Sequence, residues 1–123
     1  MTADVSAFLG KPWRPVADGP DLFDCWGLTR AASLALYGRA LPTLPDGWRP
    51  AADDVAAMGW VEQEAPAAGD VVALGNYAGH IRHVCLSLGG SRVLNTCRGL
   101  GSHVGTLQVL RVTYPIVRFY RWT

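Results

Sequence analysis

Three residues in this chain have the side-chain types that thiol-based acyl transfer needs. Cys25 stands at the start of a segment with helical periodicity, His83 begins a strand-like run, and Asn95 follows 12 residues later. A thiolate is the nucleophilic form of cysteine, and an imidazole within hydrogen-bond reach takes the thiol proton and passes it to a leaving amine. A side-chain amide can orient the second ring nitrogen of that imidazole. The three residue types therefore predict nucleophilic chemistry at a carbonyl carbon.

Each of these residues also has a purely structural interpretation. A cysteine at a helix start feels the positive end of the helix dipole and nearby amide N–H groups, which favour the thiolate, but a lone cysteine is more often a small buried apolar residue. A strand histidine is more often an ordinary polar residue, and Asn95 is more often a loop or edge residue. The Gly89-Gly90 pair predicts a tight hairpin that would bring Asn95 beside the strand of His83.

A metal site is a third interpretation of the same region. His80, His83 and Cys85 form a His-x-x-His-x-Cys pattern, with Cys97 and His103 downstream. Zinc binds such ligands, but the spacing matches no common zinc finger and the chain has no Cys-x-x-Cys pair. We therefore expect no metal. His80 and His103 lie in glycine-containing stretches, which predict exposed loops.

The elements that must position these residues follow from the hydrophobic period. Between Asp24 and Gly38, apolar residues recur at three- and four-residue steps. This pattern predicts a helix with Asp24 as its N-cap, Gly38 as its C-terminal stop and Cys25 in its first turn. Asp4–Leu9 and Ala51–Met58 predict shorter helices.

After Gly69 the period changes. Short segments rich in Val, Leu and aromatic residues, separated by Gly, Asn or Pro, are strand signals. The predicted strands are Asp70–Leu74, Arg82–Leu88, Ser91–Cys97, Thr106–Val112 and Ile116–Trp122. Helices followed by a run of strands predict an α+β fold with a mainly antiparallel sheet of about five strands.

Composition limits the classes of function. The chain has 123 residues, which predicts a single domain over 1–123. A net charge of +1 with scattered basic residues excludes a strongly electrostatic nucleic-acid binder. Three cysteines cannot form a complete disulfide framework, and no apolar run approaches the length of a membrane span. The first residues lack a basic segment followed by an apolar stretch, so we expect no secretory signal and synthesis in the cytoplasm.

Several motifs, in matching order over nearly the whole chain, resemble one known family. Phe23-Asp24-Cys25-Trp26-Gly27-Leu28, preceded by Gly10-Lys11-Pro12-Trp13, resembles the NlpC-like cysteine peptidases of bacterial cell walls, especially their phage tail-associated branch. Pro66–Val72 is similar to the family's entry into its sheet, and His83-Val84 before the glycine pair is similar to its histidine hairpin. Phe119–Trp122 is similar to the closing strand of that branch.

The resemblance implies a papain-like core in which the helix of the nucleophile packs on the sheet. It implies hydrolysis of amide bonds in peptidoglycan stem peptides through a thioester, without a metal or organic cofactor. Cys25 would be the nucleophile, His83 the general base and then acid, and Asn95 the residue that orients His83. The backbone N–H of Cys25 would help form the oxyanion hole. Asp24, Trp13 and Trp26 would line the oxyanion site and substrate cleft.

The chain departs from the family pattern at three positions. Trp13 stands where the family commonly has a tyrosine near the oxyanion site, and Asn95 stands where histidine is frequent. Cys85 replaces a usual glycine two residues after His83. Because residues two apart on a strand share a face, we expect Cys85 to point into the cleft, where it would narrow it or bond to Cys25 under oxidation.

Two functional hypotheses follow from the resemblance. The first is a tail-associated peptidase of a phage or phage-like particle, made in the host cytoplasm, carried in the virion tail and acting at the cell wall during genome delivery. Its partners would be the stem peptide and other tail-tip proteins, with no nucleic acid and no membrane span. The second is a structural tail-tip or assembly component that keeps the fold without the activity. Selective alkylation of Cys25 near neutral pH would favour the first hypothesis.

Overall fold

The structure, a computed structural model, describes residues 4–44 and 50–122. Its centre is a six-stranded sheet, in which every recorded pairing between neighbouring strands is antiparallel, with the order β1-β6-β2-β3-β4-β5. The strands are β1 Trp60–Gln63, β2 Val71–Gly75, β3 Ile81–Gly89, β4 Arg92–Cys97, β5 Gly101–Thr106 and β6 Ile116–Trp122. The predicted α+β class with a mainly antiparallel sheet is confirmed.

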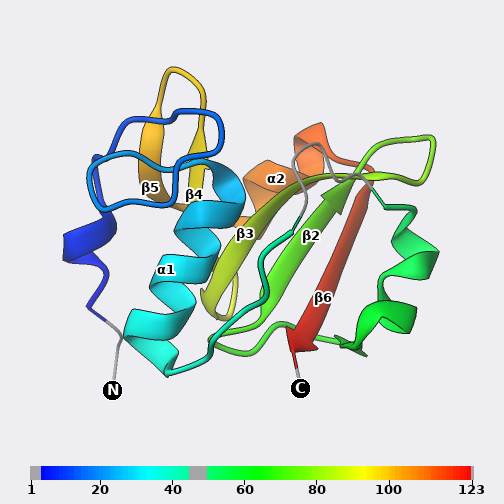
Figure 1. Cartoon of the computed structure of the whole chain (residues 1–123). Coiled ribbons are helices and arrows are strands. Elements are labelled where there is room, and N and C mark those ends of the chain that lie inside the picture. The colour runs from blue at the N-terminus through cyan, green and yellow to red at the C-terminus, as the bar shows by residue number, and fades with distance from the viewer. Residues whose placement is uncertain (1–3, 45–49, 123) are drawn as a thin grey trace.

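The helix that begins at the predicted nucleophile is α1, Cys25–Tyr37. Its start is capped because the Asp24 side chain accepts a hydrogen bond from the Gly27 N–H, and it ends where Gly38 adopts a left-handed conformation. Its apolar face packs Leu28 and Ala32 against Leu86 and Leu94 of the sheet. Figure 1 shows α1 lying across β3 and β4. Local sequence therefore fixes where Cys25 sits on the helix, and packing fixes the helix on the sheet.

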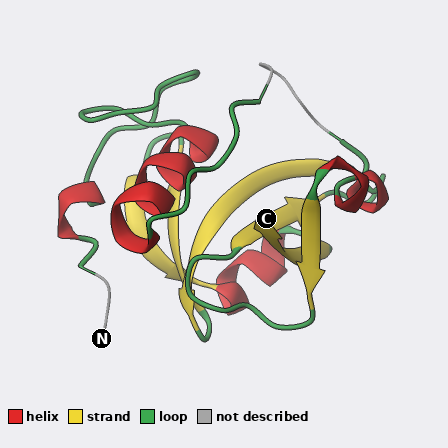
Figure 2. Cartoon of the chain, turned by 60° about the horizontal axis from the view of Figure 1, so that its bottom comes forward, coloured by secondary structure: helices red, strands yellow, loops and turns green. Residues whose placement is uncertain are grey.

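The two faces of the sheet are covered differently. Alternate residues of a strand face opposite sides, so Val71 and Ala73 of β2 share the face of α1, and Val72 and Leu74 face the other way. The second face is covered by α2, Leu107–Thr113 (Figure 2). We call the side of α1 the open face, because a cavity lies on it, and the side of α2 the packed face.

The prediction of a strand over Thr106–Val112 is wrong, because most of this segment lies in the helix α2. Thr106 ends β5 and caps the helix by accepting from the Val109 N–H, and Leu107 and Leu110 bury the same helical side. The three-residue spacing of these leucines outweighs the strand preference of the β-branched residues between and after them. The strands β1 and β5 were not predicted.

The remaining short helices are tighter than predicted. Ser6–Phe8 forms a 3₁₀ turn inside the predicted Asp4–Leu9 helix, and Ala52–Asp54 and Ala56–Met58 form two such turns inside the predicted Ala51–Met58 helix. Across the described parts of the chain, no helix is long and apolar enough to cross a membrane.

The chain before α1 closes over the start of that helix. The Asp24 N–H donates to the Ala17 carbonyl at 2.7 Å, and a Cβ on Gly27 would lie 2.1 Å from the same oxygen. Only glycine fits this approach, which explains Gly27 in the motif after the cysteine. Further upstream, the Ser102 N–H donates to the Lys11 carbonyl, so the segment leading to Trp13 is anchored on β5.

Candidate active site

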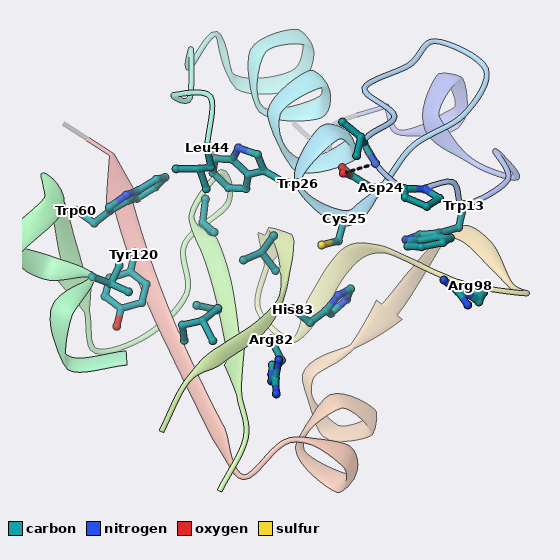
Figure 3. A pocket seen from close by; sticks show the side chains of 17 residues that line it. Trp13, Asp24, Cys25, Trp26, Leu44, Trp60, Arg82, His83, Arg98 and Tyr120 are labelled. Atoms are coloured by element: carbon teal, nitrogen blue, oxygen red, sulfur yellow. Dashed lines mark hydrogen bonds between the residues drawn. The ribbon is translucent and has the colours of Figure 1, made fainter. Parts of the chain in front are cut away.

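A cavity of about 340 Å³ lies between the start of α1 and the open face of the sheet. Figure 3 shows the side chains that line it. They are Trp13, Pro15, Val16, Asp24, Cys25, Trp26, Leu44, Val55, Trp60, Val71, Ala73, Ile81, Arg82, His83, Val84, Arg98 and Tyr120. A concave, mostly apolar pocket with a few polar groups is the usual form of a ligand site, and this one contains both Cys25 and His83.

Cys25 is the first residue of α1 and is half-buried. It carries a thiol rather than a disulfide, as do Cys85 and Cys97. Figure 3 shows its side chain leaving the helix start towards β3, where His83 lies. Thiols at helix starts are favoured as thiolates by the helix dipole and the amide groups of the first turn.

His83 lies on β3 and is tied to Asn95 of β4. The recorded pairs of these strands run from Gly89 and Arg92 to Leu86 and Leu94, and His83 and Asn95 lie beyond the last pair. There the His83 Nε2–H donates to the Asn95 Oδ1, 2.5 Å away, and the Asn95 side chain is buried.

This hydrogen bond selects the form of the imidazole. The amide oxygen of Asn95 can only accept, so the ring carries its proton on Nε2. In the neutral ring, Nδ1 then has a lone pair with which to accept a proton. The arrangement makes His83 competent as a base through Nδ1.

Tyr114, which no sequence signal singled out, stacks on His83. The ring centroids lie 5.9 Å apart and the planes meet at 9°. Tyr114 is the C-cap residue of α2, so its contribution to the site depends on a helix that was predicted as a strand. Burial, followed by the nearby cysteines, raises the pKa of the Tyr114 phenol, which therefore stays neutral near pH 7.

The other predicted cleft residues divide into two groups. Trp13, Asp24 and Trp26 line the cavity. Cys85 does not line it: its side chain is 1% exposed and packs in the cluster of the packed face. The expectation that it narrows the cleft is therefore wrong. It does share a strand face with His83, but that face lies under α2, and only its end at His83 reaches the cavity.

The alternative zinc ligands are not gathered at one point. Within residues 4–44 and 50–122, no group of three or more His, Cys, Asp or Glu side chains is placed to hold a metal ion. The prediction that His103 lies in a loop is wrong, because it lies on β5 directly across from Asn95. His80 is exposed, as predicted, and its backbone N–H donates to the Asn76 side chain.

Several lining residues were not among those predicted. Arg82 and Arg98 supply positive charge, and Trp60, Ile81 and Tyr120 supply apolar surface. Arg82 could have been found, because it precedes His83 in the chain. Trp60 and Tyr120 come from the sheet edge and β6, and no local sequence signal links them to Cys25.

The chain is similar to known proteins in both sequence pattern and structure. A family model described as the NlpC/P60 family matches residues 10–116. The structure is similar to that of the NlpC/p60 domain of the peptidoglycan hydrolase SagA, with a TM-score of 0.62 and 26% sequence identity over 93% of this chain and 88% of that chain. This likeness agrees with the predicted fold. No curated protein sequence matches the chain.

A second solved structure shows the same fold. It is a protein from Staphylococcus aureus described as similar to lipoprotein, NLP/P60 family, with a TM-score of 0.59 and 21% sequence identity. The match covers 93% of this chain but 37% of that chain.

Proposed function

Because the chain belongs to the NlpC/P60 family, we propose that it is a cell-wall hydrolase, a cysteine peptidase that cuts amide bonds in peptidoglycan stem peptides. The observation that carries the proposal is a cavity lined by both Cys25 and His83, in which Asn95 holds the His83 ring. The likeness to the domain of SagA, a peptidoglycan hydrolase, supports a cell-wall substrate.

In the proposed mechanism, the acylation step begins when His83 Nδ1 takes the proton of the Cys25 thiol. The thiolate attacks the carbonyl carbon, and the tetrahedral intermediate collapses as the carbon–nitrogen bond breaks. The imidazolium gives its proton to the leaving amine, and the acyl group stays on Cys25 as a thioester. Asn95 keeps Nε2 protonated throughout, so Nδ1 serves first as the base and then as the acid.

Deacylation repeats these roles with water. His83 Nδ1 takes a proton from a water molecule, and the hydroxide attacks the thioester carbon. The carbon–sulfur bond then breaks, the acyl group leaves as a carboxylic acid, and the imidazolium returns its proton to the Cys25 thiolate. We assign the stabilisation of the oxyanion in both tetrahedral intermediates to the backbone N–H of Cys25, which belongs to the first turn of α1 at the positive end of the helix.

The test is digestion of purified muropeptides by the reduced protein. We expect new amine termini and split stem peptides in mass spectra, and an intact thioester mass when the reaction is quenched early. Cys25→Ala is expected to abolish both signals. Cys97→Ala, which changes a thiol outside the cavity lining, is the matched control. Uncut muropeptides with the unmodified protein would refute the proposal.

We further propose that the protein acts within the tail of a phage or phage-like particle and is made in the host cytoplasm. The sequence resemblance to the tail-associated branch supports this setting, and the net charge of +1 gives the chain little attraction of its own to an anionic wall. Mass spectrometry of purified particles is expected to find the chain in the tail. Its absence there would refute the setting.

Particles carrying Cys25→Ala separate the two tail hypotheses. A loss of infectivity with normal assembly is expected for a peptidase. Normal infectivity of assembled mutant particles would instead favour a structural component of the tail tip.

A further inference from the structure

We propose that the cavity selects a substrate with a carboxylate on one side of the reacting carbonyl and an uncharged apolar group on the other. This inference deepens the proposed function, on which it rests. It comes from the unequal chemistry of the two ends of the cavity. In Figure 3, Trp13 and Arg98 lie at one end, Trp60 and Tyr120 lie at the other, and Cys25 lies between them.

The cavity carries an excess of positive charge, and at its first end the positive group is Arg98 (Figure 3). Besides the Cys25–His83 pair, the charged side chains that line the cavity are Asp24, Arg82 and Arg98. The Asp24 carboxylate already accepts hydrogen bonds from the Val16 and Gly27 N–H groups at the start of α1. Both arginines are exposed, so their N–H groups can reach a ligand. At the first end, an incoming anion meets the Arg98 guanidinium, because the Asp24 carboxylate is engaged with the backbone. Arg82 lies below His83, nearer the middle of the cavity (Figure 3).

Arg98 is held in position by an aromatic ring. Its guanidinium carbon lies 4.8 Å from the centroid of Trp13, which stands on the segment anchored to β5. A guanidinium over a ring face is attracted to the ring without using its N–H groups, which stay available to bind a carboxylate through two hydrogen bonds. Trp13 thus positions Arg98, and it does so from the place where the family pattern commonly has a tyrosine.

The second end is apolar and rigid. Val55, Trp60, Ala73, Ile81 and Tyr120 line it, and each is at most 6% exposed.

The polar atoms of two aromatic residues at this end are turned away from the cavity. The Tyr120 hydroxyl donates to the Ala52 carbonyl, and the Trp26 Nε1–H donates to the Pro42 carbonyl. Trp26 and Trp60 meet edge to face with centroids 6.0 Å apart. These contacts present hydrocarbon surface to whatever enters, and the five residues that line this end carry no charge. A charged group would lose its hydration here without gaining a partner.

The test uses the reactivity of Cys25 and needs no hydrolysis. Three haloacetyl reagents are compared: iodoacetamide, iodoacetate and N-butyl iodoacetamide. Each rate is divided by the rate of the same reagent with a small free thiol, and peptide mass spectrometry assigns the label to Cys25. We expect iodoacetate and N-butyl iodoacetamide each to be favoured over iodoacetamide by about tenfold, from charge and from buried methylene groups respectively.

Variants at the two ends should change the two preferences separately. Arg98→Met is expected to remove most of the preference for iodoacetate and to leave that for the butyl reagent. Arg111→Met, on α2 and outside the cavity lining, is the matched control. Ala73→Leu, which fills the apolar end, is expected to remove the butyl preference alone. Ala73→Val is the milder substitute if the leucine variant does not fold.

The outcomes separate this inference from the proposed function. Preferences below twofold in the unmodified protein, or preferences that survive both variants, would overturn the inference even if muropeptides are cut. If the preferences follow the variants but no muropeptide is cut, the selectivity stands and the proposed cell-wall activity fails.

Discussion

The open face and the packed face of the sheet show how one strand can serve two different environments. On the packed face, α2 covers Val72, Leu74 and Cys85 with Leu107 and Leu110. On the open face, α1 covers the part of the sheet at β3 and β4, and the cavity lies beside it, over parts of β2, β3 and β6. β3 contributes to both, because Val84 lines the cavity and Cys85 fills the packed cluster. Coverage, not residue type, decides which side chains can meet a ligand.

The two cysteines of these faces illustrate the difference. Cys25 is half-buried at the start of a helix and lines the cavity. Burial among apolar side chains, with a further contribution from Cys25, raises the pKa of the Cys85 thiol far above its usual range. The same functional group is therefore poised for chemistry on one face and held neutral on the other.

The largest expected effect is the difference in reactivity between these two thiols. With iodoacetamide near neutral pH, we expect Cys25 to be labelled at least about 10³-fold faster than Cys85, because the buried thiol is neither ionised nor accessible. Peptide mass spectrometry over a time course measures both rates. Equal rates in the folded protein would remove the distinction between the faces.

The next effect concerns the residue that orients His83. Asn95→Ala is expected to lower kcat/KM on muropeptides by about 100-fold, because Nε2 loses its acceptor and the wrong tautomer becomes populated. Asn76→Ala is the matched control, since the Asn76 side chain accepts from the His80 backbone N–H in a loop and does not line the cavity. Activity within twofold of the unmodified protein would show that the hydrogen bond to Asn95 is not used.

A smaller effect links Cys85 to stability at high pH. Below about pH 9 the thiol is protonated in both folded and unfolded chains, so it contributes no pH dependence. Above that pH the unfolded chain ionises while the folded one does not. The free energy of unfolding should then fall by up to about 1.4 kcal/mol per pH unit. Urea unfolding of the protein and of Cys85→Ala, between about pH 8 and about pH 10, should show a shallower fall in the variant. If the free energy of unfolding falls equally with pH in both proteins, Cys85 is not the source of this pH dependence.

The smallest effect tests the contact between the two faces at His83. Tyr114→Leu is expected to reduce kcat/KM by about threefold to tenfold, because the stacked ring limits the orientation of the imidazole. Tyr114→Phe keeps the ring and should restore the rate. If both variants lose the same activity, the effect comes from the hydroxyl or from α2 and not from stacking. Unfolding midpoints of both proteins provide the control for stability.

The sequence by itself determined the features that depend on neighbours along the chain. The cap at Asp24, the apolar steps of α1 and the stop at Gly38 all lie within one segment, so the helix and the position of Cys25 on it could be predicted. The Gly89-Gly90 turn likewise predicted that the strand of Asn95 folds back along that of His83, since a tight turn joins antiparallel strands.

Only the tertiary structure decided the features that depend on coverage. The alternation along β3 correctly put Cys85 on the side of His83, but it could not tell that α2 would cover that side. The segment of Leu107 and Leu110 forms a helix because both side chains pack against the sheet on its packed face. This helix brings Tyr114 onto His83. The apolar end of the cavity brings Val55 and Trp60 together with Tyr120, which lies about 60 residues further along the chain. Burial is a property of several elements packed together, so a strand's own sequence cannot specify which of its faces stays open to a ligand.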